Sequence, residues 1–192
     1  MRAGFRGLAV FFLAALVLVS FTAGCTGIRK KPAGERLAAD GELKKIAVLP
    51  FHNISGRRDA GKMVANNFVT EIFVGGRYRV EEPGNILQFM LQENVSVIGE
   101  MGIDRIKILG LRLGVDGVLV GIVDVFDDGV HSTPSVSITA RLVESETGKI
   151  VWSEQVSRSG DDYVIVFGVG KVRSANALAQ KAIREMIKTI NW

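Results

Sequence analysis

One stretch of the sequence has the residue types and spacing that could hold a phosphate group. Gly56-Arg57-Arg58-Asp59-Ala60-Gly61-Lys62 fits the pattern G-x-x-x-x-G-K, between an expected strand and an expected helix. In phosphate loops of this kind, backbone N–H groups and the lysine converge on an anion. However, Met63 follows at the position where Ser or Thr should hold Mg²⁺. Asp124 is the one candidate for the second nucleotide-binding motif, but the strand that precedes it is expected to enter an antiparallel hairpin. We therefore interpret this stretch as a glycine-rich turn into an amphipathic helix.

The other residues with chemical potential do not form a catalytic pattern. Neither histidine, His52 or His131, has an Asp, Glu or Cys at metal-ligand spacing. The motifs G-x-S-x-G and H-E-x-x-H are missing from the sequence, and no nucleophile has an evident base. Carboxylates gather at two expected turns, and they either bind a cation weakly or are simply solvated. They are Asp124, Asp127, Asp128, Asp161 and Asp162. We predict no enzyme, no metal and no organic cofactor.

The single cysteine, Cys25, follows a segment with the features of an export signal. Arg2 and Arg6 precede an apolar run from Leu8 to Val19, and small residues come next. The run is shorter than the about 20 residues that span a bilayer, although an uncleaved N-terminal anchor is the alternative. One cysteine also excludes a disulfide within the chain and a C-x-x-C redox pair.

The stretch Thr22-Ala23-Gly24-Cys25 resembles the lipobox of bacterial lipoproteins, with Thr22 where that pattern usually has Leu. The resemblance implies removal of residues 1–24 as a signal peptide. Cys25 then becomes an N-terminus that carries diacylglycerol and an amide-linked acyl chain such as palmitate, and two or more chains anchor a protein stably. The alternative is that Cys25 is an incidental or buried thiol. Thr26 stands where lipoproteins retained in the inner membrane have Asp, which favours an outer-membrane location facing the periplasm.

Residues 25–43 comprise the acylated cysteine and a polar, glycine- and alanine-containing stretch that we interpret as a flexible tether. The formal net charge of the chain is +4, but two of these charges, Arg2 and Arg6, belong to the signal. The remaining excess is small, so we expect no nucleic-acid partner. The hydrophobic fraction of 47% excludes a disordered chain.

Residues 44–192 are expected to form one domain. Short apolar runs predict strands over 45–51, 78–80, 117–125, 135–143 and 149–156, and helical spacing predicts helices over 63–73, 86–91, 103–113 and 174–190. Asp104 is the expected N-cap of the third helix and Gly114 its C-terminal stop. The expected fold is α/β (α+β): a mixed sheet of about five strands in the order β-α-β-α-α-β-β-β-α, with an antiparallel C-terminal meander and helices packed on the sheet.

Three stretches resemble the CsgG / TolB-N-terminal-like / LpoB-type superfamily of periplasmic domains. They are KIAVLPFHNISG from Lys45, LGLRLGVDGVLVGIVDVF from Leu109 and ARLVESETGKIVWSEQVS from Ala140. The resemblance implies a noncatalytic, membrane-anchored assembly factor or protein-interaction domain of the cell envelope. It also implies an alternative, an oligomeric secretion component that forms a pore. A third hypothesis is that the protein is a nucleotide-binding enzyme.

An almost wholly apolar stretch, Tyr163 to Val169, leads into the last helix. It is either a short element packed on the core or a contact surface for self-association or for an envelope protein partner. The residues of this candidate interaction surface are Tyr163, Val164, Ile165, Val166 and Phe167.

Overall fold

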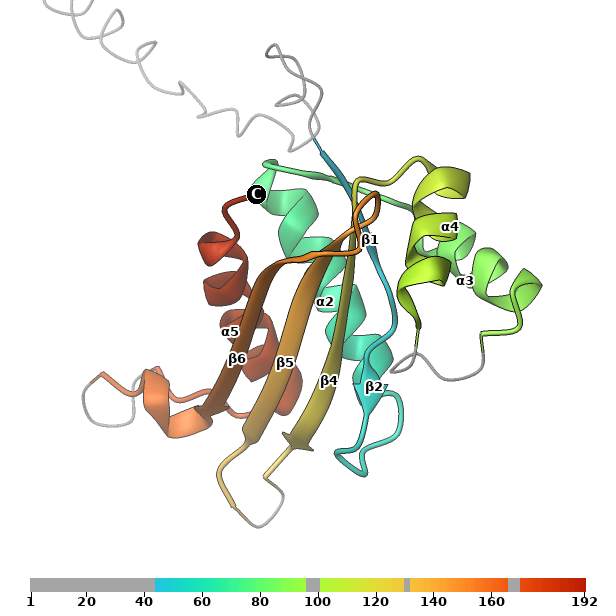
Figure 1. Cartoon of the computed structure of the whole chain (residues 1–192). Coiled ribbons are helices and arrows are strands. Elements are labelled where there is room, and N and C mark those ends of the chain that lie inside the picture. Colours follow the sequence, from blue (N-terminus) through green and yellow to red (C-terminus); the bar gives the residue numbers. More distant parts are fainter. Residues whose placement is uncertain (1–43, 96–100, 130–131, 166–169) are drawn as a thin grey trace, which may run out of the picture. The chain divides into compact units, whose positions relative to one another are not determined.

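A computed structural model describes residues 44–95, 101–129, 132–165 and 170–192. The expected signal, Cys25, the tether, His131, Val166 and Phe167 all lie outside these residues. The described part forms one mixed sheet in the order β3-β1-β4-β5-β6, with β2 also paired to β4 (Figure 1). Its strands are β1 (Lys45–Val48), β2 (His52–Asn53), β3 (Arg79–Val80), β4 (Gly117–Asp127), β5 (Ser135–Glu144) and β6 (Ile150–Ser159). The helices are α2 (Ala60–Gly75), α3 (Pro83–Gln92), α4 (Ile103–Leu113) and α5 (Ala175–Thr189), with a short 3₁₀ helix, η3 (Gly160–Tyr163).

This arrangement confirms the expected α/β fold. Strand β1 pairs in parallel with both β3 and β4, and β4, β5 and β6 form the antiparallel meander. Two details differ from the prediction. The first strand ends at Val48, and a separate two-residue strand, β2, follows it. Asp104 is not the N-cap of α4: Gly102 holds that position, and Asp104 lies in the first turn, where its charge favours the helix dipole.

The break between β1 and β2 exists because Phe51 turns into the core. Its ring stacks on Phe68 of α2 with centroids 5.1 Å apart, and only 3% of the residue is exposed. Gly121 of β4 makes room for the ring, since a methyl group there would overlap it. The backbone N–H of Phe51 donates to the carbonyl of Gly61 at 3.2 Å. The proline-containing turn after β1 therefore holds α2 against the sheet.

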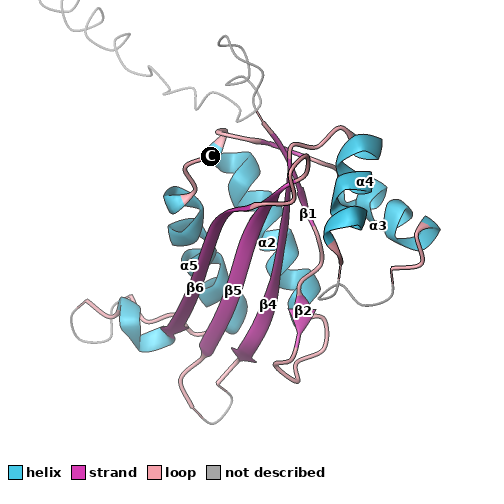
Figure 2. Ribbon diagram, viewed as in Figure 1, coloured by secondary structure: helices cyan, strands magenta, loops and turns pink. Residues whose placement is uncertain are grey.

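Helices α2 and α5 cover one face of the sheet, behind the strands in the view of Figure 2. Alternate residues of β5 point into this layer, as the two-residue period of a strand requires. The predicted apolar stripe of α5 meets them, and every member of both sets is buried: Val136, Ile138, Ala140, Leu142, Leu178, Ala179, Ala182, Ile183, Met186, Ile187 and Ile190.

Helices α3 and α4 cover the other face, but only over β1, β4 and the end of β5 at Val143. Their buried side chains, among them Ile86, Phe89, Ile106 and Leu109, form a second core with Ala47 and Val118. In Figure 2 these two helices lie to the side of the meander, and no described helix lies in front of β5 and β6. The described helices therefore leave one face of the meander uncovered.

An ion pair between the buried Glu71 and the exposed Arg184 joins the two helices of the first layer. The carboxylate of Glu71 in α2 accepts two hydrogen bonds from Arg184 of α5, each 2.9 Å long, and one from Gln180 at 3.0 Å. The hydrogen bonds from Arg184 lower the pKa of Glu71, and burial opposes that shift only in part. The ionised pair is therefore the form that the fold stabilises.

We expect Arg184→Met to destabilise the protein by about 1–3 kcal/mol at neutral pH, because it leaves the buried Glu71 carboxylate without its main partner. The pKa of Glu71 is lower in the fold than its ordinary value of 4.5. The stability from this pair is therefore complete above pH 4.5 and disappears as the pH falls through the lowered pKa. Thermal unfolding from pH 3 to pH 7 should show a difference from the parent protein that narrows on acidification. Lys188→Met, a change of an exposed residue on the same helix, should have little effect at any pH.

Candidate functional site

The stretch that resembles a phosphate loop holds its own turn together. The side-chain amide of Asn53 donates to the carbonyl of Arg57 at 2.7 Å, and its oxygen accepts from the N–H of Ser55 at 3.1 Å. Arg57 forms an ion pair with Asp128. A side chain at Gly61 would overlap the carbonyl of Phe51. The two glycines thus serve a turn and a close contact, as the interpretation from the sequence proposed.

The carboxylates at the first turn also have structural partners. Asp127 accepts from the N–H of Gly129 at 2.9 Å, and Asp128 accepts from the N–H of Ala175 at 3.2 Å, at the start of α5. Asp124 contacts the hydroxyl of Thr139 at 3.4 Å. Within the described ranges, no group of three or more His, Cys, Asp or Glu side chains could hold a metal ion.

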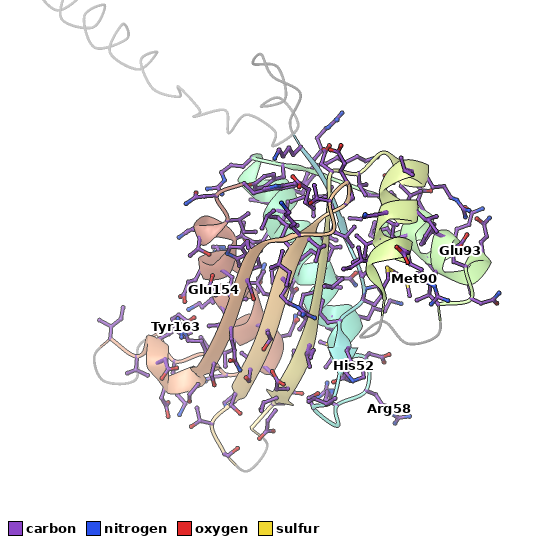
Figure 3. The ribbon with its side chains drawn as sticks, viewed as in Figure 1. His52, Arg58, Met90, Glu93, Glu154 and Tyr163 are labelled. Carbon is purple, nitrogen blue, oxygen red and sulfur yellow. The ribbon has the colours of Figure 1, made fainter. Side chains whose placement is uncertain are left out.

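The second pair of carboxylates caps the 3₁₀ helix after β6. Asp162 accepts from the N–H of Ser159 at 2.7 Å. Asp161 lies 2.9 Å from the ammonium of Lys171, and the hydrogen bond from Lys171 lowers the pKa of Asp161. His52 is the first residue of β2, and Figure 3 shows it on the opposite side of the sheet's strands from Tyr163, the last residue of this 3₁₀ helix. His52 is half-buried. These groups fix loops, and we assign no chemistry to them.

The predicted interaction surface is divided in two by the structure. Tyr163, labelled in Figure 3, is half-buried against the first core, and its hydroxyl donates to Glu185 of α5 at 3.0 Å. Burial, and then Glu185, raise the pKa of Tyr163. Val164 is 38% exposed and Ile165 is 80% exposed. Of the described residues in this set, Ile165 is therefore the one most available for a contact.

The face of β5 and β6 that points away from α2 and α5 has no described helix over it. We call it the open face. It consists of two rows of side chains in register: Ser137, Thr139 and Arg141 on β5, opposite Ser157, Gln155 and Ser153 on β6. The rows are polar, as is usual for an antiparallel sheet with one solvated face.

A hollow of about 240 Å³ lies where the open face meets α4. Arg141 contributes its only charged side chain. The other lining residues are apolar or glycine: Met101, Ile103, Ile106, Val120, Gly121, Ile122, Val143, Gly148 and Ile150. Ile103 and Ile150 are 54% and 55% exposed. The hollow is therefore an apolar depression with one cation and an exposed hydrophobic rim.

Arg141 has no hydrogen-bond or ion-pair partner among the described residues, whereas arginines elsewhere in the domain, such as Arg57, Arg158 and Arg184, are paired. In the sequence, Arg141 is only one of the polar residues that alternate with apolar residues over 135–143. The residues around it come from α4, β4 and the turn after β5, so their convergence depends on the tertiary fold. An arginine in the middle of a strand is the one local signal that pointed to it.

Comparison with known proteins gives matches only at the level of structure. No protein-family model matches the chain, and no curated protein sequence does. Among solved structures, a PelC dodecamer from Paraburkholderia phytofirmans is 20% identical, with a TM-score of 0.51 over 78% of this chain and 89% of that one. Lipoprotein GNA1162 from Neisseria meningitidis is 21% identical, with a TM-score of 0.52 over 77% and 99%.

The C-terminal domain of LpoB from Escherichia coli also matches, over 66% of this chain and 92% of that one. It is 17% identical, and its TM-score of 0.47 is too low to carry an argument. Identities near 20% establish the fold alone: this chain shares its architecture with PelC and with a bacterial lipoprotein. The resemblance to CsgG stays a prediction. Among the described residues, no helix is both long and apolar enough to cross a membrane.

Proposed function

We propose that the protein is a noncatalytic lipoprotein of the bacterial envelope that binds another protein through its open face. The hollow beside Arg141 is the observation that carries this proposal. Polar side chains alone would make the open face an ordinary solvated surface. The exposed isoleucines around the unpaired Arg141 distinguish the open face from an ordinary solvated surface, because exposed hydrophobic patches mark interaction sites.

The lipoprotein part of the proposal rests on the lipobox-like sequence at Cys25 and on the fold shared with GNA1162. Acyl chains on Cys25 would anchor the chain in the membrane, and residues 26–43 would connect the anchor to the domain. Thr26 supports the outer membrane, with the domain facing the periplasm. In this position the domain is limited to partners close to the membrane surface.

Cys25→Ala should move the protein from the membrane fraction to the soluble fraction, because Cys25 is the only cysteine and the diacylglycerol can be attached only to its thiol. The measurement is immunoblotting of fractions after an alkaline wash, in cells that express the full chain. Cys25→Ser, which also lacks the thiol, is the matched second variant. A protein that stays in the membrane with either substitution would contradict the anchoring proposal.

Self-association is a second candidate function, and it corresponds to the oligomeric secretion component suggested by the sequence. The PelC match is a dodecamer. In this chain, β6 pairs only with β5 in the described sheet, and the exposed Ile165 follows shortly after it. A strand at the edge of a sheet is a natural place for a second copy to add.

The two candidates make different predictions for Gln155→Lys, a charge placed in the middle of the open face. Affinity isolation of the full chain from membranes should recover a second protein with the parent, and at least tenfold less of it with the variant. Thr70→Lys, an equal change at an exposed position of α2, should recover the parental amount. A complex made only of copies of this chain would favour self-association instead, and equal recovery with both variants would refute the open face as the contact surface.

A further inference from the structure

We infer that the hollow beside Arg141 receives the C-terminal end of a partner polypeptide. The terminal carboxylate would pair with Arg141, and an apolar last side chain would contact the isoleucines of the rim. This inference rests on the proposed function, because it specifies the chemistry of the partner at the same site.

The charge in the hollow selects the ligand. Arg141 is the only charged residue among those that line the hollow, and no carboxylate is bound to it within the described part of the chain. A guanidinium offers two parallel N–H donors, which match the two oxygens of a carboxylate. Arg141 is itself exposed, and an apolar side chain seated against the walls of the hollow would exclude water from the pair and strengthen it.

The shape of the hollow favours the end of a chain. Gly148 has a φ of 75°, and a side chain there would overlap Ile103 of α4, so the turn after β5 and the start of α4 meet at this place. Gly148 and Ile103 both line the hollow, so this contact forms one of its walls. The volume of about 240 Å³ lies below the roughly 300–1,000 Å³ of pockets that hold drug-sized ligands. This is room for one or two residues and too little for a helix or a strand.

The polar rows of the open face lead away from the hollow and favour a polypeptide over an acyl chain. Ser153 lies opposite Arg141, and Gln155 lies opposite Thr139 one step further from the turn. Their side chains offer donors and acceptors to the amide groups of the residues that precede a C-terminus. An acyl chain along the same path would cover these polar groups without binding them, which is unfavourable.

The test uses the full-length protein and a pair of fluorescent peptides, Gly-Gly-Val-Leu with a free C-terminal carboxylate and the same peptide as a C-terminal amide. Fluorescence anisotropy should show binding of the free acid and at least tenfold weaker binding of the amide. Arg141→Gln should weaken binding of the free acid at least tenfold and leave binding of the amide unchanged. Arg105→Gln, at an exposed α4 position that does not line the hollow, should bind both peptides as the parent does.

Equal binding of acid and amide, unchanged binding by Arg141→Gln, or no binding at millimolar peptide would each overturn the inference. Decanoate that displaces the free acid at equal or lower concentration would also overturn it, in favour of an anionic lipid. These results would reject the binding of a chain end without rejecting the proposed function. If Gln155→Lys still abolishes recovery of the envelope partner, the open face remains the contact surface and only the assignment of a chain end is lost.

Discussion

The structure depends on how the helices divide the two faces of one sheet. Helices α2 and α5 cover one face of the sheet, whereas α3 and α4 cover the other face over β1, β4 and the end of β5 at Val143. Side chains alternate across a strand, so each residue of β5 belongs either to a dense apolar core or to a surface with no described helix above it. The boundary between the covered and uncovered parts passes beside Arg141, and the hollow results from this incomplete covering.

The three stretches that resemble the superfamily of periplasmic domains are needed to build this arrangement. Phe51 fills the space between α2 and the sheet, and Asn53 closes the turn that returns the chain to α2. In the second stretch, the carboxylate of Asp116 accepts from the N–H of Lys45 at 2.6 Å, which fixes the start of β1 against β4. Ser145 donates to the carbonyl of Val115 at 2.5 Å and so ties the end of β5 to the same place. The residues of these stretches thus explain the fold, and the function has to be sought on surfaces that they do not form.

Local patterns predicted most of the elements. The apolar stripe of α5 and the alternation of β5 follow from short-range periods in the sequence, and the structure buries the apolar residues of both. Phe51 was placed in a continuous strand because its own neighbours are apolar; its insertion beside Phe68 and Gly121 depends on partners far along the chain. The site was predicted less well. Tyr163 is tied to Glu185, a contact that no local pattern shows, and the hollow joins residues from Met101 to Ile150.

The central claim is that the open face touches another envelope protein in the cell. Photo-crosslinking in living cells tests it most directly, with a photoreactive amino acid placed at position 155 on the open face or at position 70 on the exposed side of α2. The account predicts a crosslinked product with a second protein from position 155 and none from position 70. No product from position 155, or the same product from both positions, would contradict it.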